Sequence, residues 1–197
     1  MCIRDSIDVV TLDTGRLFPE TYALWAKTEE KYHKKIQAFY PNQKDVEALV
    51  SKNGINGFYE SLEARKSCCH VRKVIPLERA LNNVDIWITG IRGNQTANRQ
   101  NMNFVEWDEQ RKLVKVNPLL DWSKKTIDSY VETNTIPVNI LHSQNYPSIG
   151  CQPCTRAIKP GEDERAGRWW WENEVNGNGQ ECGLHVGPDG RLVRQKA

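Results

Sequence analysis

The fold class is decided by the stretch Ile7–Phe39, IDVVTLDTGRLFPETYALWAKTEEKYHKKIQAF. Its opening run, residues 7–12, is short and apolar, which is typical of a buried strand. Pro19 suits the first turn of an amphipathic helix that we expect to continue to about Lys34. A second strand is expected over residues 35–39. A strand–helix–strand unit of this kind predicts two parallel strands in one sheet.

The same alternation continues along the chain. Helices are expected over 43–52, 58–72 and 123–133, and strands over 85–89, 104–107 and 113–116. The last two strands are expected to form a hairpin-like pair. The pattern predicts an α/β domain over 7–172, with a mostly parallel sheet flanked by helices. Asn, Gly and Gln dominate after Trp171, so a mobile C-terminal tail is expected over 173–197.

Composition excludes several classes of protein. The 197 residues can form one domain with a sizeable core, and 39% hydrophobic with 26% charged residues excludes a disordered chain. No apolar run reaches the roughly 18 residues that span a membrane, and no signal peptide is visible. The formal net charge of +2 argues against a general nucleic-acid binder. We therefore expect a cytoplasmic protein that binds neither nucleic acid nor membranes.

Four of the six cysteines form two close pairs, Cys68-Cys69 and Cys151-Gln-Pro-Cys154. Clustered cysteines in a reducing compartment favour metal or redox chemistry over disulfides. Four thiolates suit either zinc or an iron–sulfur cluster. Adjacent side chains on a helix point about 100° apart, so both can reach only a large target. This spacing favours a cluster with several irons over a single small ion.

Basic residues surround both cysteine pairs, and a fifth cysteine, Cys182, lies in the expected tail. The basic residues indicate either solvated surface or a site for an anion. A lone tail cysteine is inert in most proteins. Here Gly183 gives backbone freedom and His185 could favour the thiolate, so Cys182 is also a candidate nucleophile. The Trp169–Trp171 run indicates either core packing or an aromatic wall at the site, and one ring at least is expected to be partly exposed.

Several longer motifs carry a family resemblance. They are LDTGRLFPETY (12–22), CCHVRKVIPLERAL (68–81), TGIRGNQ (89–95), YPSIGCQPCTRAI (146–158), ERAGRWWWE (164–172) and ECGLHV (181–186). Together they resemble the assimilatory sulfonucleotide reductases, and most closely the adenylyl-sulfate (APS) reductases that carry a [4Fe–4S] cluster. The resemblance implies a PP-loop fold of the adenine nucleotide alpha hydrolase-like type. It also implies a role in assimilatory sulfate reduction and cysteine biosynthesis.

The resemblance implies reduction of APS to sulfite and AMP. Cys182 would attack the sulfate sulfur to give an enzyme S-sulfocysteine, with His185 beside it in the same motif. Thioredoxin or glutaredoxin, as a separate protein, would then release sulfite. The cluster ligands would be Cys68, Cys69, Cys151 and Cys154. The family is often oligomeric, so a homo-oligomer is compatible with the resemblance.

Substrate binding is implied for basic residues, because a phosphosulfate anion needs fixed cations around it. The matching positions are Lys73, Arg165 and Arg168, with Arg92 and Arg156 as further candidates and Arg72 as a weaker one. In TGIRGNQ a glycine, Gly93, stands where the family has a basic residue. This departure limits the inference for that loop to Arg92.

The N-terminus departs from the family pattern. No strand and Ser/Gly-rich phosphate loop precede Ile7, so we expect a chain truncated at this end, and residues 1–6 are read as non-native. Three alternatives stay open. They are a 3′-phosphoadenylyl-sulfate (PAPS) reductase with the same chemistry, a PP-loop sulfate adenylyltransferase-like protein, and a zinc-stapled binding module.

Overall fold

The computed structural model describes residues 7–95 and 99–172, and these residues fall into two compact units. The first unit consists of residues 7–80 and 137–172. The second unit consists of residues 81–95 and 99–136. Within the described residues, no helix combines the length and the apolar composition needed to cross a bilayer.

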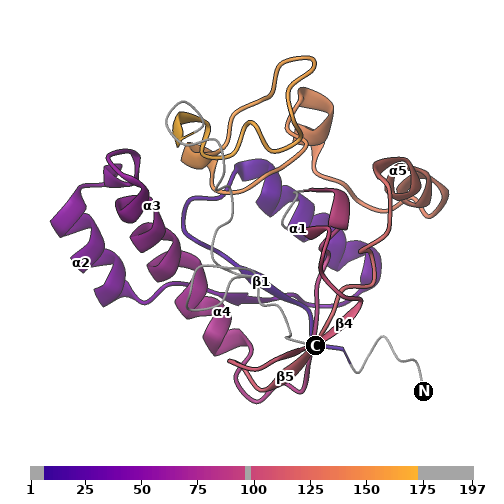
Figure 1. Ribbon diagram of the computed structural model, residues 1–197, viewed down its shortest axis with the longest axis horizontal. Coiled ribbons are helices and arrows are strands. Elements are labelled where there is room, and N and C mark those ends of the chain that lie inside the picture. The colour runs from indigo at the N-terminus through magenta and orange to yellow at the C-terminus, as the bar shows by residue number, and fades with distance from the viewer. Residues whose placement is uncertain (1–6, 96–98, 173–197) are drawn as a thin grey trace. The chain divides into compact units, whose positions relative to one another are not determined.

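The first unit opens with the expected strand–helix–strand arrangement (Figure 1). Strand β1 (Val10–Leu12) pairs in parallel with β2 (Gln37–Phe39), and helix α1 (Pro19–Tyr32) connects them. Pro19 lies in the first turn of α1, as expected for a residue without an N–H to donate. Both strands are shorter than the predicted ones, which covered residues 7–12 and 35–39.

The turn after β1 is closed by a buried carboxylate. Asp13 accepts hydrogen bonds from the backbone N–H of Gly15 at 2.8 Å and from the Tyr22 hydroxyl at 2.9 Å. Gly15 adopts a left-handed φ of 71°, which glycine reaches without steric cost. Residues 13–16 therefore form a turn directly after β1.

The expected helix over 58–72 is divided in the structure. A 3₁₀ turn, η2, covers Gly57–Tyr59. It is followed by Ser61, whose extended backbone has φ −157° and whose hydroxyl accepts from the Ala64 N–H at 3.1 Å. Ser61 is therefore the N-cap of a new helix, α3 (Leu62–Cys69). The single long helix was wrong, because a capping serine favours a helix start over helix continuation.

Two further helical segments follow α3. A π-helical turn, η3 (His70–Val74), leads into α4 (Ile75–Ala80), which the sequence did not predict. The predicted helix stopped at residue 72, whereas in the structure Pro76, which has no N–H for an intrahelical bond, lies at the second position of α4. Helix α2 (Gln43–Asn53) ends at Gly54, as expected.

The second unit is built on a three-stranded sheet in the order β3-β5-β4. Strand β3 (Ile86–Ile88) is parallel to β5 (Leu113–Val116), and β4 (Val105–Asp108) is antiparallel to β5. The expected hairpin-like pair is therefore confirmed. Helix α5 (Lys124–Thr133) begins at Ser123, whose hydroxyl accepts from the Thr126 N–H at 3.0 Å. The short 3₁₀ turns along the chain are η4 (Gly93–Gln95), η6 (Ile140–Gln144), η7 (Gln152–Cys154) and η8 (Trp170–Glu172).

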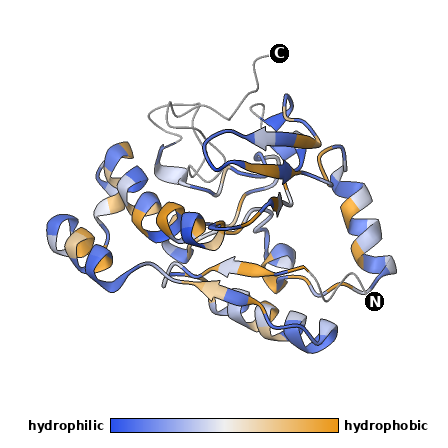
Figure 2. Ribbon diagram, turned by 90° about the horizontal axis from the view of Figure 1, so that it is seen from below, coloured by the Kyte–Doolittle hydropathy of each residue, from blue (hydrophilic) through white to orange (hydrophobic). Residues whose placement is uncertain are grey.

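Polar groups fill one face of this sheet. Lys115 and Glu106 form an ion pair of 2.7 Å between side chains that are only 3% and 5% exposed. Asn117 donates to Glu106 at 3.4 Å and accepts from the Thr89 hydroxyl at 2.5 Å, so the buried groups satisfy one another. Hydrophobic residues lie along the strands of Figure 2, while the helices carry both hydrophobic and hydrophilic residues.

The buried Lys115–Glu106 pair gives a stability prediction. Lys115→Met removes the cation and leaves a buried carboxylate, so the free energy of unfolding should fall by about 3–5 kcal/mol. The control Lys124→Met breaks a pair with Asp128 whose side chains are 58% and 60% exposed, and should cost less than about 1 kcal/mol. Urea unfolding followed by tryptophan fluorescence measures both. Equal losses in the two variants would contradict the role of the buried pair.

Candidate functional site

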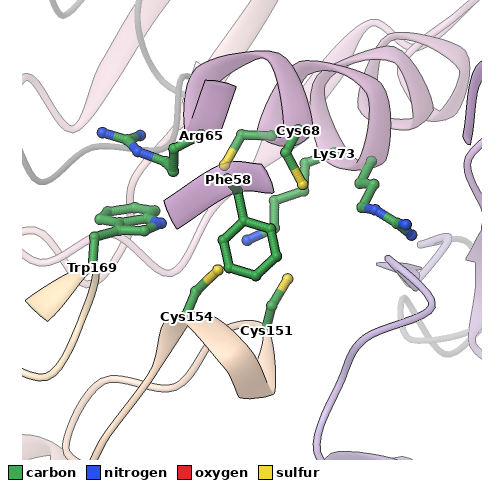
Figure 3. Close-up of a pocket in the computed structure, with 9 residues that line it drawn as sticks. Phe58, Arg65, Cys68, Lys73, Cys151, Cys154 and Trp169 are labelled. Atoms are coloured by element: carbon green, nitrogen blue, oxygen red, sulfur yellow. The ribbon is translucent and has the colours of Figure 1, made fainter. Parts of the chain in front are cut away.

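The two cysteine pairs of the sequence meet in one pocket of the first unit. Cys68 and Cys69 lie at the end of α3, while Cys151 is the N-cap of the short turn η7 and Cys154 is its last residue. All four line one pocket, together with Phe58. In Figure 3 the sulfur atoms of Cys151 and Cys154 point toward α3, from which the Cys68 side chain descends. None of the four is in a disulfide.

Backbone hydrogen bonds hold the Cys-x-x-Cys loop in this position. The Cys154 N–H donates to the Cys151 carbonyl at 3.0 Å, which closes the 3₁₀ turn. The Gln152 N–H donates to the Arg16 carbonyl at 2.8 Å, and the Tyr59 hydroxyl donates to the Pro153 carbonyl at 2.5 Å. The turn after β1 and the η2 turn therefore both anchor the loop.

Cations line the same pocket. Arg72 and Lys73 come from η3, and both are buried. Arg72 donates to the Thr14 carbonyl at 2.7 Å, and the Thr14 hydroxyl lies 3.2 Å from the Cys151 sulfur. The structure therefore brings the predicted Lys73 to the cysteines. It also adds Thr14, whose only sequence signal was its place in the turn after a strand.

The thiols of Cys151 and Cys154 have pKa values shifted in opposite directions. Burial would raise the pKa of the Cys151 thiol, but the Lys73 ammonium, the Thr14 hydroxyl and the Arg168 guanidinium outweigh it, so this pKa lies below its usual value. Burial, followed by the charge on Cys151, raises the pKa of Cys154 to about 12. The protein groups thus favour a thiolate at Cys151 and a neutral thiol at Cys154. Among the described residues, no three Cys, His, Asp or Glu side chains are arranged around a single-ion metal site.

Trp169 forms the floor of the basic region. It is 1% exposed and has a left-handed φ of 45°, an unfavourable backbone conformation for a bulky residue. The guanidinium carbons of Arg65 and Arg168 lie 4.5 Å and 4.7 Å from its ring centroid. Trp170 is 39% exposed, while Trp171 packs on the cysteine cluster, so the expectation of one partly exposed ring is confirmed.

Arg165 and Arg168 converge on one residue. Arg165 donates to the Ser148 hydroxyl at 3.3 Å, and Arg168 donates to the same hydroxyl at 3.5 Å. A Cβ added to Gly150 would lie 2.4 Å from Arg168 Nη2, so the absence of a side chain at position 150 lets this guanidinium approach. Both arginines are buried in the first unit.

The remaining predicted residues lie elsewhere. Arg156 is more exposed and forms a two-point ion pair with Glu162, at 2.8 and 2.9 Å. Arg92 belongs to the second unit and follows β3. Cys182 and His185 lie outside the described residues. Arg65, noted in the sequence only as part of a basic cluster, is fully buried at the pocket.

Comparisons with known proteins agree on one group. The family described as Phosphoadenosine phosphosulfate reductase domain matches residues 1–157. Adenosine 5'-phosphosulfate reductase of Agrobacterium fabrum is 58% identical over 183 residues, which is 93% of this chain and 69% of that protein. The same-named protein of Rhizobium tropici is 58% identical over 175 residues, which is 89% of this chain and 96% of that protein.

A solved structure has the same fold. The crystal structure of phosphoadenylyl-sulfate (PAPS) reductase from Candida auris, in a phosphate complex, matches with a TM-score of 0.63 and 27% sequence identity. The match covers 77% of this chain and 71% of that chain. It supports the α/β arrangement that the sequence predicted.

The Arg156–Glu162 pair gives a pH prediction. Arg156, followed by the Lys159 N–H, lowers the pKa of Glu162 to about 2. Because this pKa lies below the unfolded value of about 4.3, the stabilisation is present above pH 4.3 and is lost as pH falls toward 2. Arg156→Gln should raise the pKa of Glu162 toward 4.3 in a carboxyl-carbon NMR titration. Glu29 is the control, because the Ile36 N–H and Lys35 lower its pKa to about 2 and the substitution should not move it. An unchanged Glu162 pKa would contradict the assignment.

Proposed function

This chain belongs to the phosphoadenosine phosphosulfate reductase domain family, among the adenosine 5'-phosphosulfate reductases, and we propose that it reduces APS to sulfite and AMP through a covalent intermediate on Cys182. One observation carries the proposal. Two cysteine pairs and a buried lysine share a single pocket, and two buried arginines contact the same serine nearby.

The cations suit the substrate. APS carries a phosphosulfate anion, and a thiolate can approach it only when this charge is balanced. Lys73 lies in the pocket, and Arg168 keeps a buried Nε that has no hydrogen-bond partner among the described residues. A buried donor of this kind favours an anionic ligand. Arg165 is assigned the same role, with Arg156 and Arg92 as further contacts.

The first step is a group transfer. The Cys182 thiolate attacks the sulfate sulfur, the bond from sulfur to the bridging phosphate oxygen breaks, and AMP leaves with the electron pair. The product on the enzyme is S-sulfocysteine. His185, three residues after the nucleophile, favours the thiolate form of Cys182.

The second step needs a dithiol reductant, for which thioredoxin or glutaredoxin is proposed. One reductant thiolate attacks the Cys182 sulfur, the bond between the two sulfur atoms of the intermediate breaks, and sulfite leaves with the electron pair. The second thiol of the reductant then resolves the mixed disulfide and restores the Cys182 thiolate. The two electrons thus come from the reductant, which is left as a disulfide.

The four pocket cysteines are proposed to hold a [4Fe–4S] cluster. The donor set fits, because four free thiols from two segments line one pocket and a hydroxyl lies against the Cys151 sulfur. When bound, the cluster would add a compact charged group beside the substrate site. Lys73 lines the same pocket and would link the bound group to the substrate site. We propose the cytoplasm as the location of the protein, because two pairs of cysteine thiols suit a reducing compartment.

The covalent intermediate can be tested by intact mass. The full chain incubated with APS and no reductant should gain one sulfite-sized adduct, and added thioredoxin should remove it. Cys182→Ser should abolish the adduct, because the nucleophile is lost. Cys2→Ser is the matched control and should form the adduct at the wild-type rate. An adduct that persists in Cys182→Ser would overturn the proposal, and faster labelling by PAPS than by APS would change the substrate.

The cluster can be tested separately by metal analysis. Protein prepared without oxygen should contain about four irons and four sulfides per chain. Cys69→Ser and Cys154→Ser should each lose most of the iron, because each removes one ligand. Cys182→Ser should retain it, because this residue has no ligand role. Stoichiometric zinc in place of iron would refute the cluster.

A further inference from the structure

We propose that Arg65 is a positioning residue, which fastens the start of the Cys182 segment to the helix that carries Cys68 and Cys69. The inference rests on the proposed function, since it assigns Cys182 as the nucleophile. The start of that segment, here called the tail root, is residues 169–172. Arg65 holds the tail root at two points.

The first point is a buried ion pair. Arg65 Nε donates to Glu172 Oε1 at 2.8 Å, and Arg65 Nη2 donates to Glu172 Oε2 at 2.9 Å. The two parallel hydrogen bonds fix both the distance and the relative orientation of the Arg65 guanidinium and the Glu172 carboxylate. The Arg65 side chain is 1% exposed and Glu172 is 16% exposed, so salt screens the pair only weakly.

The second point is the Trp169 ring. The Arg65 guanidinium lies on the side of this ring that faces α3 (Figure 3), and its carbon is 4.5 Å from the ring centroid. The left-handed backbone of Trp169 is unfavourable and persists only where neighbouring contacts hold it. Arg65 supplies one such contact from α3. The backbone bond from the Trp169 N–H to the Cys154 carbonyl, at 3.1 Å, supplies another from the Cys-x-x-Cys loop.

Because Arg65 belongs to α3, its contacts link the tail root to the helix that carries two of the pocket cysteines. Arg65 lies three and four residues before Cys68 and Cys69, so the three side chains share one face of the helix. One side chain of the helix that carries Cys68 and Cys69 therefore contacts both Trp169 and Glu172, the last described carboxylate of this segment.

Chain length makes the anchor important for the reaction. Cys182 lies ten residues after Glu172, so the thiol can lie at most about 35 Å from the root. A fixed root gives that segment a defined origin beside the pocket, which raises the frequency of productive approach. Loosening the root should slow sulfur transfer and leave the binding of substrate and of the cysteine-held group unchanged.

Glu172→Gln tests the anchor, because the amide loses the charge and one acceptor oxygen. Chymotrypsin should cleave after Trp170 and Trp171 several-fold faster than in the wild type. Adduct formation on Cys182 should slow by about ten- to a hundredfold, with KM for APS changed less than about threefold and iron content unchanged. If the pair only stabilised the fold, Glu172→Gln would lower the unfolding midpoint but would not slow adduct formation at an unchanged KM.

Glu29→Gln is the matched control. Glu29 is 17% exposed, pairs with Lys35 at 2.7 Å and lies far from the root in the sequence. This variant should behave as wild type in both assays. Arg65→Lys keeps the charge but loses the fork, and it should reproduce the effect of Glu172→Gln. The double variant should be no slower than either single variant, because both remove the same contact.

The outcomes separate the two proposals. Wild-type cleavage rates in both Glu172→Gln and Arg65→Lys would overturn the anchor. Faster cleavage with adduct formation at the wild-type rate would overturn its role in the reaction. Absence of an adduct in the wild type would instead overturn the proposed function, and the cleavage rates would still decide whether Arg65 holds the root.

Discussion

A buried cysteine thiolate is stable only when cations and hydrogen-bond donors lie close to its sulfur atom. In the first unit this requirement determines which segments pack around Cys151. The Cys151 thiolate is favoured by Lys73, the Thr14 hydroxyl and Arg168, against the cost of its burial. These three groups come from the turn after β1, from η3 and from the segment before η8. Each segment must therefore stay in place for the sulfur to keep its charge, and the unit's packing and its chemistry depend on the same contacts.

The basic residues of the site do not act as separate surface charges. Arg65 and Arg168 share the Trp169 ring, Arg72 is fixed to the Thr14 carbonyl, and Lys73 lies among the four sulfur atoms. Guanidinium groups held by stacking and by hydrogen bonds lose little entropy when an anion arrives. In the proposed reaction, a preorganised set of cations of this kind would stabilise an anionic transition state.

Local patterns predicted the strand–helix–strand start, the helix beginning at Ser123, the antiparallel β4–β5 pair and the closeness of basic residues to the cysteines. They could not predict contacts between distant segments. Thr14 and Cys151 are 137 positions apart, and Arg65 and Glu172 are 107 positions apart. The predicted helix over 58–72 missed the cap at Ser61, although a serine is a local signal for a helix start, and it also missed α4, which contains Pro76. The ligand and nucleophile roles were inferred from family motifs, and they stay proposals.

The π-helical turn η3 has a consequence for how this segment can vary. A π turn holds one residue more than an α-helical turn, so it behaves as a one-residue insertion inside a helix. Deleting that residue would return the segment to regular α-helix with α4 still in phase with α3, and the π turn that carries Arg72 and Lys73 would be lost. Length changes are usually tolerated in loops and avoided in helices. Here the extra residue belongs to the turn that brings Arg72 and Lys73 to the pocket, so its loss would change the placement of these two cations rather than that of α4.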